Sequence, residues 1–186
     1  MFKFTDEEYN FVLKTTTRYA CNEYESSKKK RHQRNQFNKD RIIKQNVIGK
    51  IGEFAAMFYL LDQGKQCTSP DMKVYNGPKK SFDADLILDN KPLHVKSQSK
   101  ATSDYFKCVS WTFQKGGKGA GHTDPLTKKS LDDLVIFCHV DGQNVKIYGP
   151  YQWKDIKPLL KDPILERLKG IKQCIYLEYL KKNIIN

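Results

Sequence analysis

The chain has 186 residues, of which 39% are hydrophobic and 12% are aromatic. This length fits one domain, and the composition excludes a disordered basic tail. The formal net charge of +12 favours a polyanionic partner such as nucleic acid, although it indicates a class of partner and no particular activity.

The cysteines, the N-terminus and the apolar runs bear on the cellular compartment. The five cysteines are scattered without a CxxC pair, which favours free thiols in a reducing cytoplasm. The N-terminal stretch MFKFTDEEYN is polar and acidic, unlike a signal peptide. No apolar run approaches the ~20 residues of a membrane span. We therefore expect a cytoplasmic protein that does not associate with a membrane.

The N-terminal region is predicted to be helical and basic. Thr5 to Glu8 matches a capping box, and the apolar spacing after it predicts a helix from about residue 6 to the mid-twenties. The stretch 26–44 that follows is rich in Lys and Arg. Such a stretch is either a solvated connector or a surface that contacts nucleic-acid phosphates. In the second case, the expected DNA-binding residues are Lys28, Lys29, Lys30, Arg31 and Arg34, joined by Lys115 and Lys118 from a Gly-rich stretch.

A second helix is predicted from about residue 40 to residue 61, where apolar residues recur on one face. Gly49 and Gly52 lie inside it, and each costs about 1 kcal/mol of helix propensity relative to Ala. That cost suggests a close backbone approach, with the helix lying flat on a sheet. Glu53 follows directly among apolar neighbours. A carboxylate in such a place is uncommon unless it is paired or bound to a metal ion.

The stretch FDADLILDNKPLHVKSQ has the pattern of an antiparallel hairpin. A four-residue loop at 89–92 would pair Leu88 with Leu93, and therefore Asp85 with Lys96. Because strand side chains alternate between faces, one face would be mostly apolar. The other face would carry Asp83, Asp85, His94, Lys96 and Gln98.

This polar face has two interpretations. It is either a solvated outer face with cross-strand ion pairs, or a metal-dependent phosphodiesterase site. In such a site carboxylates hold a hard divalent cation, while a lysine ammonium orients water and offsets the charge of the phosphate.

The rest of the chain supplies further strands. Residues 105–114 are β-prone, 134–140 (LVIFCHV) are typical of a buried central strand, and 174–180 favour an edge strand or a contact surface. His139 in the apolar run is interpreted as a satisfied core histidine. The Gly-rich stretch KGGKGAGH lacks the P-loop pattern, so no nucleotide cofactor is expected.

These elements predict an α/β (α+β) fold in which helices flank a central mixed sheet. We expect one domain over 1–186, with a helical, basic N-terminal region at 1–45 and a core at 46–186 that carries the site.

A helix Glu, a strand Asp, and a Lys on the next strand resemble the PD-(D/E)xK nuclease superfamily, which implies a restriction-endonuclease-like fold. The resemblance makes Glu53 the helix acid, Asp85 the principal metal ligand and Lys96 the lysine that deprotonates or orients the attacking water. His94 stands where the family carries a second acid, although imidazole is a poorer ligand for Mg²⁺ than a carboxylate.

The same resemblance implies the surroundings of this site. Mg²⁺ would be held by Asp85 and the carbonyl of Val95, with Glu53 bound directly or through water. Gln98 would support the phosphate or Lys96. Asp83 is an alternative to Asp85 if the strand register differs.

The whole chain, through IGKIGEFAAMF, FDADLIL and LHVKSQ, resembles the small catalytic subunits of heterodimeric type IIS restriction endonucleases. This implies double-stranded DNA as substrate and a larger partner subunit that recognises the site and nicks the other strand. Alternatives are a stand-alone structure-selective nuclease of the junction-resolvase or repair type, a non-catalytic basic DNA-binding module, and a nuclease inactivated by His94.

Overall fold

The computed structural model describes residues 1–33, 35–75, 84–115, 126 and 131–185. Among the predicted site residues, Asp83, Arg34 and Lys118 lie outside this part of the chain. The helices and strands are β1 (Phe2–Lys3), α1 (Asp6–His32), α2 (Lys39–Leu61), β2 (Leu86–Leu88), β3 (Lys91–Ser99), α3 (Lys100–Phe106), β4 (Ser110–Gln114), β5 (Leu134–Asp141), β6 (Asn144–Gln152), α5 (Trp153–Ile156), η1 (Lys157–Leu159), η2 (Glu166–Leu168), β7 (Lys172–Tyr176) and α6 (Leu177–Asn183).

The central sheet has the strand order β1-β6-β5-β3-β2. β3 and β5 are parallel, whereas the other pairs are antiparallel. A separate antiparallel pair is formed by β4 and β7. The prediction of a central mixed sheet flanked by helices is therefore confirmed. β5, the predicted buried strand, lies in the middle of the sheet with most of its side chains buried, as an apolar run with little alternation requires.

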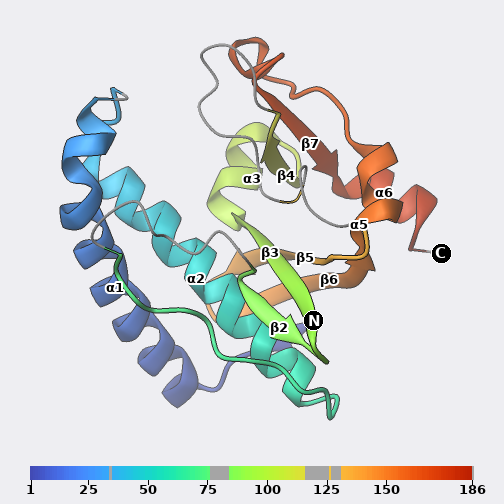
Figure 1. Ribbon diagram of the computed structural model, residues 1–186, viewed down its shortest axis with the longest axis horizontal. Helices are drawn as coiled ribbons and strands as arrows, with labels where there is room; N and C mark the ends of the chain where they lie inside the picture. The colour runs from blue at the N-terminus through green and yellow to red at the C-terminus, as the bar shows by residue number, and fades with distance from the viewer. Residues whose placement is uncertain (34, 76–83, 116–125, 127–130, 186) are drawn as a thin grey trace.

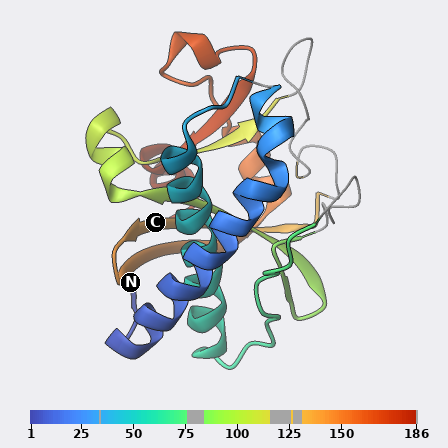
Figure 2. The same cartoon turned by 90° about the vertical axis from the view of Figure 1, so that its left-hand side faces the viewer.

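The sheet separates two apolar clusters. α1 and α2 cross one face (Figure 2), and the cluster on that side includes Phe54, Leu93 and Cys138. The β4–β7 pair, α5 and α6 lie beyond the other face (Figure 1), where Phe113 and Phe137 belong to the second cluster. Alternate residues of β5 thus enter different clusters, as strand pleating dictates.

α2 lies against β3 at one of its two interior glycines. A Cβ at Gly52 would stand 1.9 Å from the Ser97 Oγ and 3.3 Å from the Cys138 Cβ. A Cβ at Gly49 would meet nothing within 4 Å. The predicted close approach is therefore confirmed at Gly52 and wrong at Gly49. Glu53, the next residue, is buried beside this contact.

The β2–β3 hairpin has a tighter turn than predicted. Leu88 pairs with Lys91, and Asp89 and Asn90 both have positive φ, 47° and 65°, as in a two-residue type I′ turn. Asp and Asn tolerate this conformation better than most residues, so a four-residue loop is unnecessary. The register moves by two residues, which keeps every side chain on its predicted face and places Asp85 opposite His94 instead of Lys96.

Three boundaries also differ from the sequence prediction. α1 continues to His32 through the basic stretch, because basic residues in a last turn complement the helix dipole. Ser99 caps a short helix, α3, which extends into the start of the predicted strand 105–114, so β4 begins only at Ser110. The predicted C-terminal strand divides at Leu177 into β7 and α6.

Among the described helices, none combines the length and the apolar character that crossing a membrane requires.

Candidate active site

The candidate site lies just before the start of β2, where β3 continues beyond its pairing with β2. β2 pairs with β3 only as far as Leu93, although β3 runs to Ser99. Beyond that point Asp85 makes two hydrogen bonds to the backbone of β3. Its N–H donates to the Leu93 carbonyl at 3.1 Å, and its Oδ2 accepts the Val95 N–H at 2.8 Å. Asp85 therefore stands at the open end of the ladder, with its carboxylate against the strand that carries Lys96.

Glu53 lies on α2, the helix that packs against β3 at Gly52. Its neighbour Gly52 contacts Ser97. Burial raises the pKa of the Cys138 thiol, and the charge of Glu53 raises it further. Cys138, on β5, pairs with Ser97. The Glu53 side chain is buried, and its Oε2 accepts a hydrogen bond from the Lys50 Nζ at 2.6 Å. From the sequence, a buried carboxylate is expected to be either paired or bound to a metal ion. Glu53 is paired, with a lysine one turn away on α2.

The Lys96 side chain projects from the face of β3 that is turned away from α2. Ser97 faces α2, so strand alternation directs Lys96 toward the β4–β7 pair. Its Nζ lies 5.2 Å from the centroid of the Phe113 ring, a distance typical of a cation–π contact. Glu53 and Lys96 therefore lie on opposite faces of β3, so the predicted convergence of Glu53, Asp85 and Lys96 around one cation stays a prediction.

His94 makes a contact that the sequence did not reveal. Its Nε2 lies 3.2 Å from the Asp133 Oδ2, and both side chains are buried. Asp133 directly precedes β5, and the parallel pairing of Leu93 with Leu134 brings it beside His94. That pairing joins segments about 40 residues apart, so spacing within either segment could not predict it. His94 thus has a carboxylate partner that lies on another segment of the chain.

Gln98 connects β3 to the start of β4. Its Oε1 accepts the Ser110 N–H at 3.0 Å, and its Nε2 donates to the Cys108 carbonyl at 3.5 Å. These bonds fix the side chain next to the Lys96 face of β3. Support of a phosphate or of Lys96 by Gln98 stays a prediction.

Magnesium requires several oxygen ligands that converge on one point. Among the described residues, no three His, Cys, Asp or Glu side chains are grouped so that they could hold a metal ion. Asp85 already accepts a bond from Val95, and Glu53 is paired with Lys50. The described part of the chain therefore does not complete a magnesium site.

His139, on β5, is satisfied within the protein. Its Nε2 lies 2.8 Å from the Ser103 Oγ, and burial lowers its pKa. The prediction that His139 is satisfied within the protein is therefore confirmed, although its side chain is half-buried and does not belong to the core.

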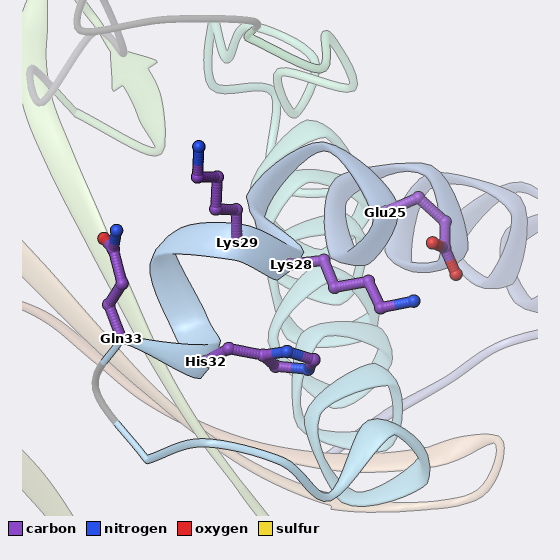
Figure 3. Close-up of a pocket in the computed structure, with 5 residues that line it drawn as sticks. All are labelled: Glu25, Lys28, Lys29, His32 and Gln33. Carbon is purple, nitrogen blue, oxygen red and sulfur yellow. The ribbon is translucent and has the colours of Figure 1, made fainter.

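The predicted DNA-binding residues on α1 differ in their surroundings. The side chains of Lys28, Lys29 and Lys30 are exposed, and Figure 3 shows Lys28 and Lys29 extending from the end of α1 above His32. Arg31 is instead held against its own helix, because its Nε donates to the Ser27 Oγ at 2.6 Å. Lys115 is exposed beyond the end of β4.

Two surface hollows are distinct from the candidate site. One is formed by Glu25, Lys28, Lys29, His32 and Gln33 at the end of α1 (Figure 3). The other lies beside β7 and α6 and is bounded by three lysines and by the rings of Tyr176 and Tyr179. Neither is lined by Glu53, Asp85 or Lys96. The first coincides with predicted DNA contacts.

Comparison with protein-family models, curated proteins and solved structures gives no match to this chain. The resemblance to PD-(D/E)xK nucleases therefore stays a prediction from the sequence.

Proposed function

We propose that this chain is a Mg²⁺-dependent endodeoxyribonuclease that hydrolyses one strand of double-stranded DNA. We further propose that it acts as the small catalytic subunit of a heterodimeric type IIS restriction endonuclease, beside a larger subunit that recognises the site. The observation that carries the proposal is the position of Asp85, whose carboxylate bonds to Val95 at the open end of the β2–β3 ladder. Lys96 follows on the same strand.

The two side chains suit complementary tasks. Among the described residues, the Asp85 Oδ1 has no hydrogen-bond donor, so this oxygen is available to a cation or a water molecule. Lys96 carries a compact ammonium on a flexible stem, which can move from the Phe113 ring to a phosphate oxygen or a water. Because Asp85 and Lys96 flank one short segment of β3, a phosphodiester at this edge could contact both.

Glu53 and His94 have supporting positions in this proposal. Glu53 follows Gly52, which packs against Ser97 of β3, and would contribute once Lys50 released it. His94 is oriented by Asp133, the residue that precedes β5. The comparison of Mg²⁺ with EDTA in the assay below tests the dependence on Mg²⁺, because the described carboxylates do not complete a magnesium site.

A non-catalytic DNA-binding module is the second candidate. The ion pair between Lys50 and Glu53 and the buried pair of His94 with Asp133 satisfy those polar groups without metal. The exposed lysines on α1 would be enough for sequence-independent binding.

A cleavage assay with supercoiled plasmid separates these functions. The purified chain is incubated alone and with its candidate large subunit, in Mg²⁺ or in EDTA. The proposal predicts nicked DNA from the large subunit alone and linear DNA from the mixture, only with Mg²⁺. Cleavage by the chain alone, above all on branched DNA, would favour a stand-alone nuclease. Binding without cleavage under every condition would favour the binding module.

A further inference from the structure

The hollow beside β7 and α6 is shaped by hydrogen bonds between three separate segments. Tyr176 is the most buried residue of its lining. The Tyr176 hydroxyl donates to the Asp162 carbonyl at 3.0 Å and accepts the Ile164 N–H at 2.9 Å. On another side, the Leu177 N–H donates to the Val109 carbonyl at 3.0 Å. The hollow is therefore part of the fold, and its volume of about 690 Å³ lies in the range of ligand-binding sites, about 300–1,000 Å³.

The hollow opens on the face of the β4–β7 pair that points away from the candidate active site. Trp111 and its partner Ile175 face the central sheet, because the Trp111 Nε1 donates to a carbonyl of β5 at 2.9 Å. Phe113, which Lys96 contacts, shares that face. Successive residues of a strand point to opposite faces, so Tyr176 and the hollow lie on the other face. A ligand in the hollow thus does not occupy the space of the candidate active site.

Three lysines from different segments stand around the hollow. Lys107 follows α3, Lys161 follows η1, and Lys181 belongs to α6. All three side chains are exposed, and the ion pairs formed among the described residues include none of these three ammonium groups. Asp162 and Glu178 also line the hollow, so the lysines outnumber the acids there. The unpaired lysines, in a chain with a net charge of +12, favour an anionic ligand.

Exposed aromatic rings stand beside these lysines. Tyr179 is 39% exposed, and the Lys161 Nζ lies 5.4 Å from the centroid of its ring. Tyr105 and Phe106, the residues before Lys107, are also exposed, and their rings meet edge to face at 4.8 Å. Phosphates alone make no use of such rings, whereas the bases of an unpaired strand stack on them. Lysines interleaved with exposed rings are therefore typical of a surface that binds single-stranded nucleic acid.

We propose that the hollow beside β7 and α6 binds single-stranded DNA. A base would stack on the Tyr179 ring, while the three lysines would contact backbone phosphates. A duplex keeps its bases stacked on one another, so it would use the lysines but not the ring. The choice of DNA over RNA rests on the proposed function. The carboxylate of Glu178 repels phosphates, and its removal should strengthen binding.

The test measures binding in EDTA, where cleavage cannot interfere. Fluorescence anisotropy of a labelled 15-nucleotide thymidine strand and of a labelled 20-base-pair duplex is recorded for the parent chain and for Tyr179→Ala. Loss of stacking should lower the affinity for the single strand about fivefold or more and leave the affinity for the duplex nearly unchanged. Tyr179→Phe keeps the ring and should preserve both affinities. Phe11→Ala, which removes an exposed ring from α1, is the matched control and should preserve both as well.

Charge variants keep the test decisive even if the ring variant impairs folding. Lys107→Met with Lys181→Met alters only exposed side chains. It should lower the slope of log affinity against log salt for the single strand by about 1.4, or about 0.7 per lysine–phosphate contact. Lys3→Met with Lys146→Met removes two exposed lysines from β1 and β6 and should leave that slope nearly unchanged. Glu178→Gln should raise the affinity for the single strand roughly twofold.

The outcomes separate this site from the nuclease proposal. A selective loss on the single strand supports the site even if no variant cleaves DNA. Unchanged binding in both Tyr179→Ala and the variant of Lys107 and Lys181 overturns it, even if Asp85-dependent cleavage is observed. Equal losses on the duplex, or in Phe11→Ala, also overturn it, because binding would then follow charge or stability alone.

Two further measurements test the nature of the ligand. Tighter binding of a uridine RNA strand of the same length would overturn the assignment to DNA. Loss of co-elution of Tyr179→Ala with the large subunit, at unchanged affinity for the single strand, would overturn the proposal and assign the hollow to a protein partner.

Discussion

Replacing Gly52 by Ala tests how closely α2 approaches the strand that carries Lys96. A Cβ at this position would stand 1.9 Å from the Ser97 Oγ, 3.0 Å from the Ser97 Cβ and 3.3 Å from the Cys138 Cβ. Rotation of the serine hydroxyl relieves only the first contact, so the helix or the strand must move. Overpacking of this kind typically costs about 1–3 kcal/mol of folding free energy.

Gly49→Ala is the matched control, because it lies in the same helix and its Cβ would meet nothing within 4 Å. Both substitutions gain about 1 kcal/mol from the greater helix propensity of Ala. The difference between the variants therefore isolates the packing cost of about 1–3 kcal/mol. For a chain of this size, each kcal/mol shifts Tm by about 2–4 °C.

The assay is urea and thermal denaturation of the parent and both variants, with Gly52→Ala expected to melt several degrees below Gly49→Ala. Ser97→Ala in the Gly52→Ala background should recover part of the loss, because it removes the nearest atom. Equal stabilisation by the two glycine substitutions would refute the close approach of α2 to β3.

Two further predictions concern buried polar groups. Asp133→Ala should lower the free energy of unfolding by about 1–3 kcal/mol, because it leaves the His94 imidazole buried without its partner. Asp155→Ala, at an exposed side chain of α5, is the control, and equal effects in denaturant titrations would contradict the pairing. His139→Gln should flatten the pH dependence of stability below pH 6.5. Burial lowers the pKa of His139 in the folded state from 6.5, so the unfolded chain takes up the proton first and stability falls as pH falls from 6.5 toward the folded-state pKa. Melting curves between pH 7.5 and 5 check this, and an unchanged slope in the variant would count against it.

Local patterns predicted much of the fold. The capping box at Thr5 is formed in both directions, and the apolar run 134–140 is the buried central strand. Such features depend on residues close together in sequence, where periodicity and turn chemistry decide the outcome. The turn at Asp89 shows the limit, because two turn lengths fit the same residues and only the conformation of Asp and Asn favours the shorter one.

Contacts between distant segments were not predictable. Asp133 meets His94 only because β3 and β5 are parallel neighbours, and Lys96 meets the Phe113 ring only because β4 packs near β3. A single sequence carries no signal for either pairing. The buried charge of Glu53 was anticipated, but its partner Lys50 was not, although a spacing of three residues on a helix permits the contact.

Asp85→Asn gives the most direct test of the proposed nuclease site. The amide oxygen can still accept the Val95 N–H, so the fold should persist while the carboxylate charge is lost. Asp89→Asn is the control, since Asp89 also accepts a backbone N–H in this hairpin, from Gln66 at 3.1 Å. With the large subunit and Mg²⁺ present, Asp85→Asn should convert linear product to nicked product, with second-strand cutting reduced about a hundredfold or more, equivalent to about 2.7 kcal/mol. Undiminished second-strand cutting by Asp85→Asn, at a melting temperature equal to that of Asp89→Asn, would contradict the account.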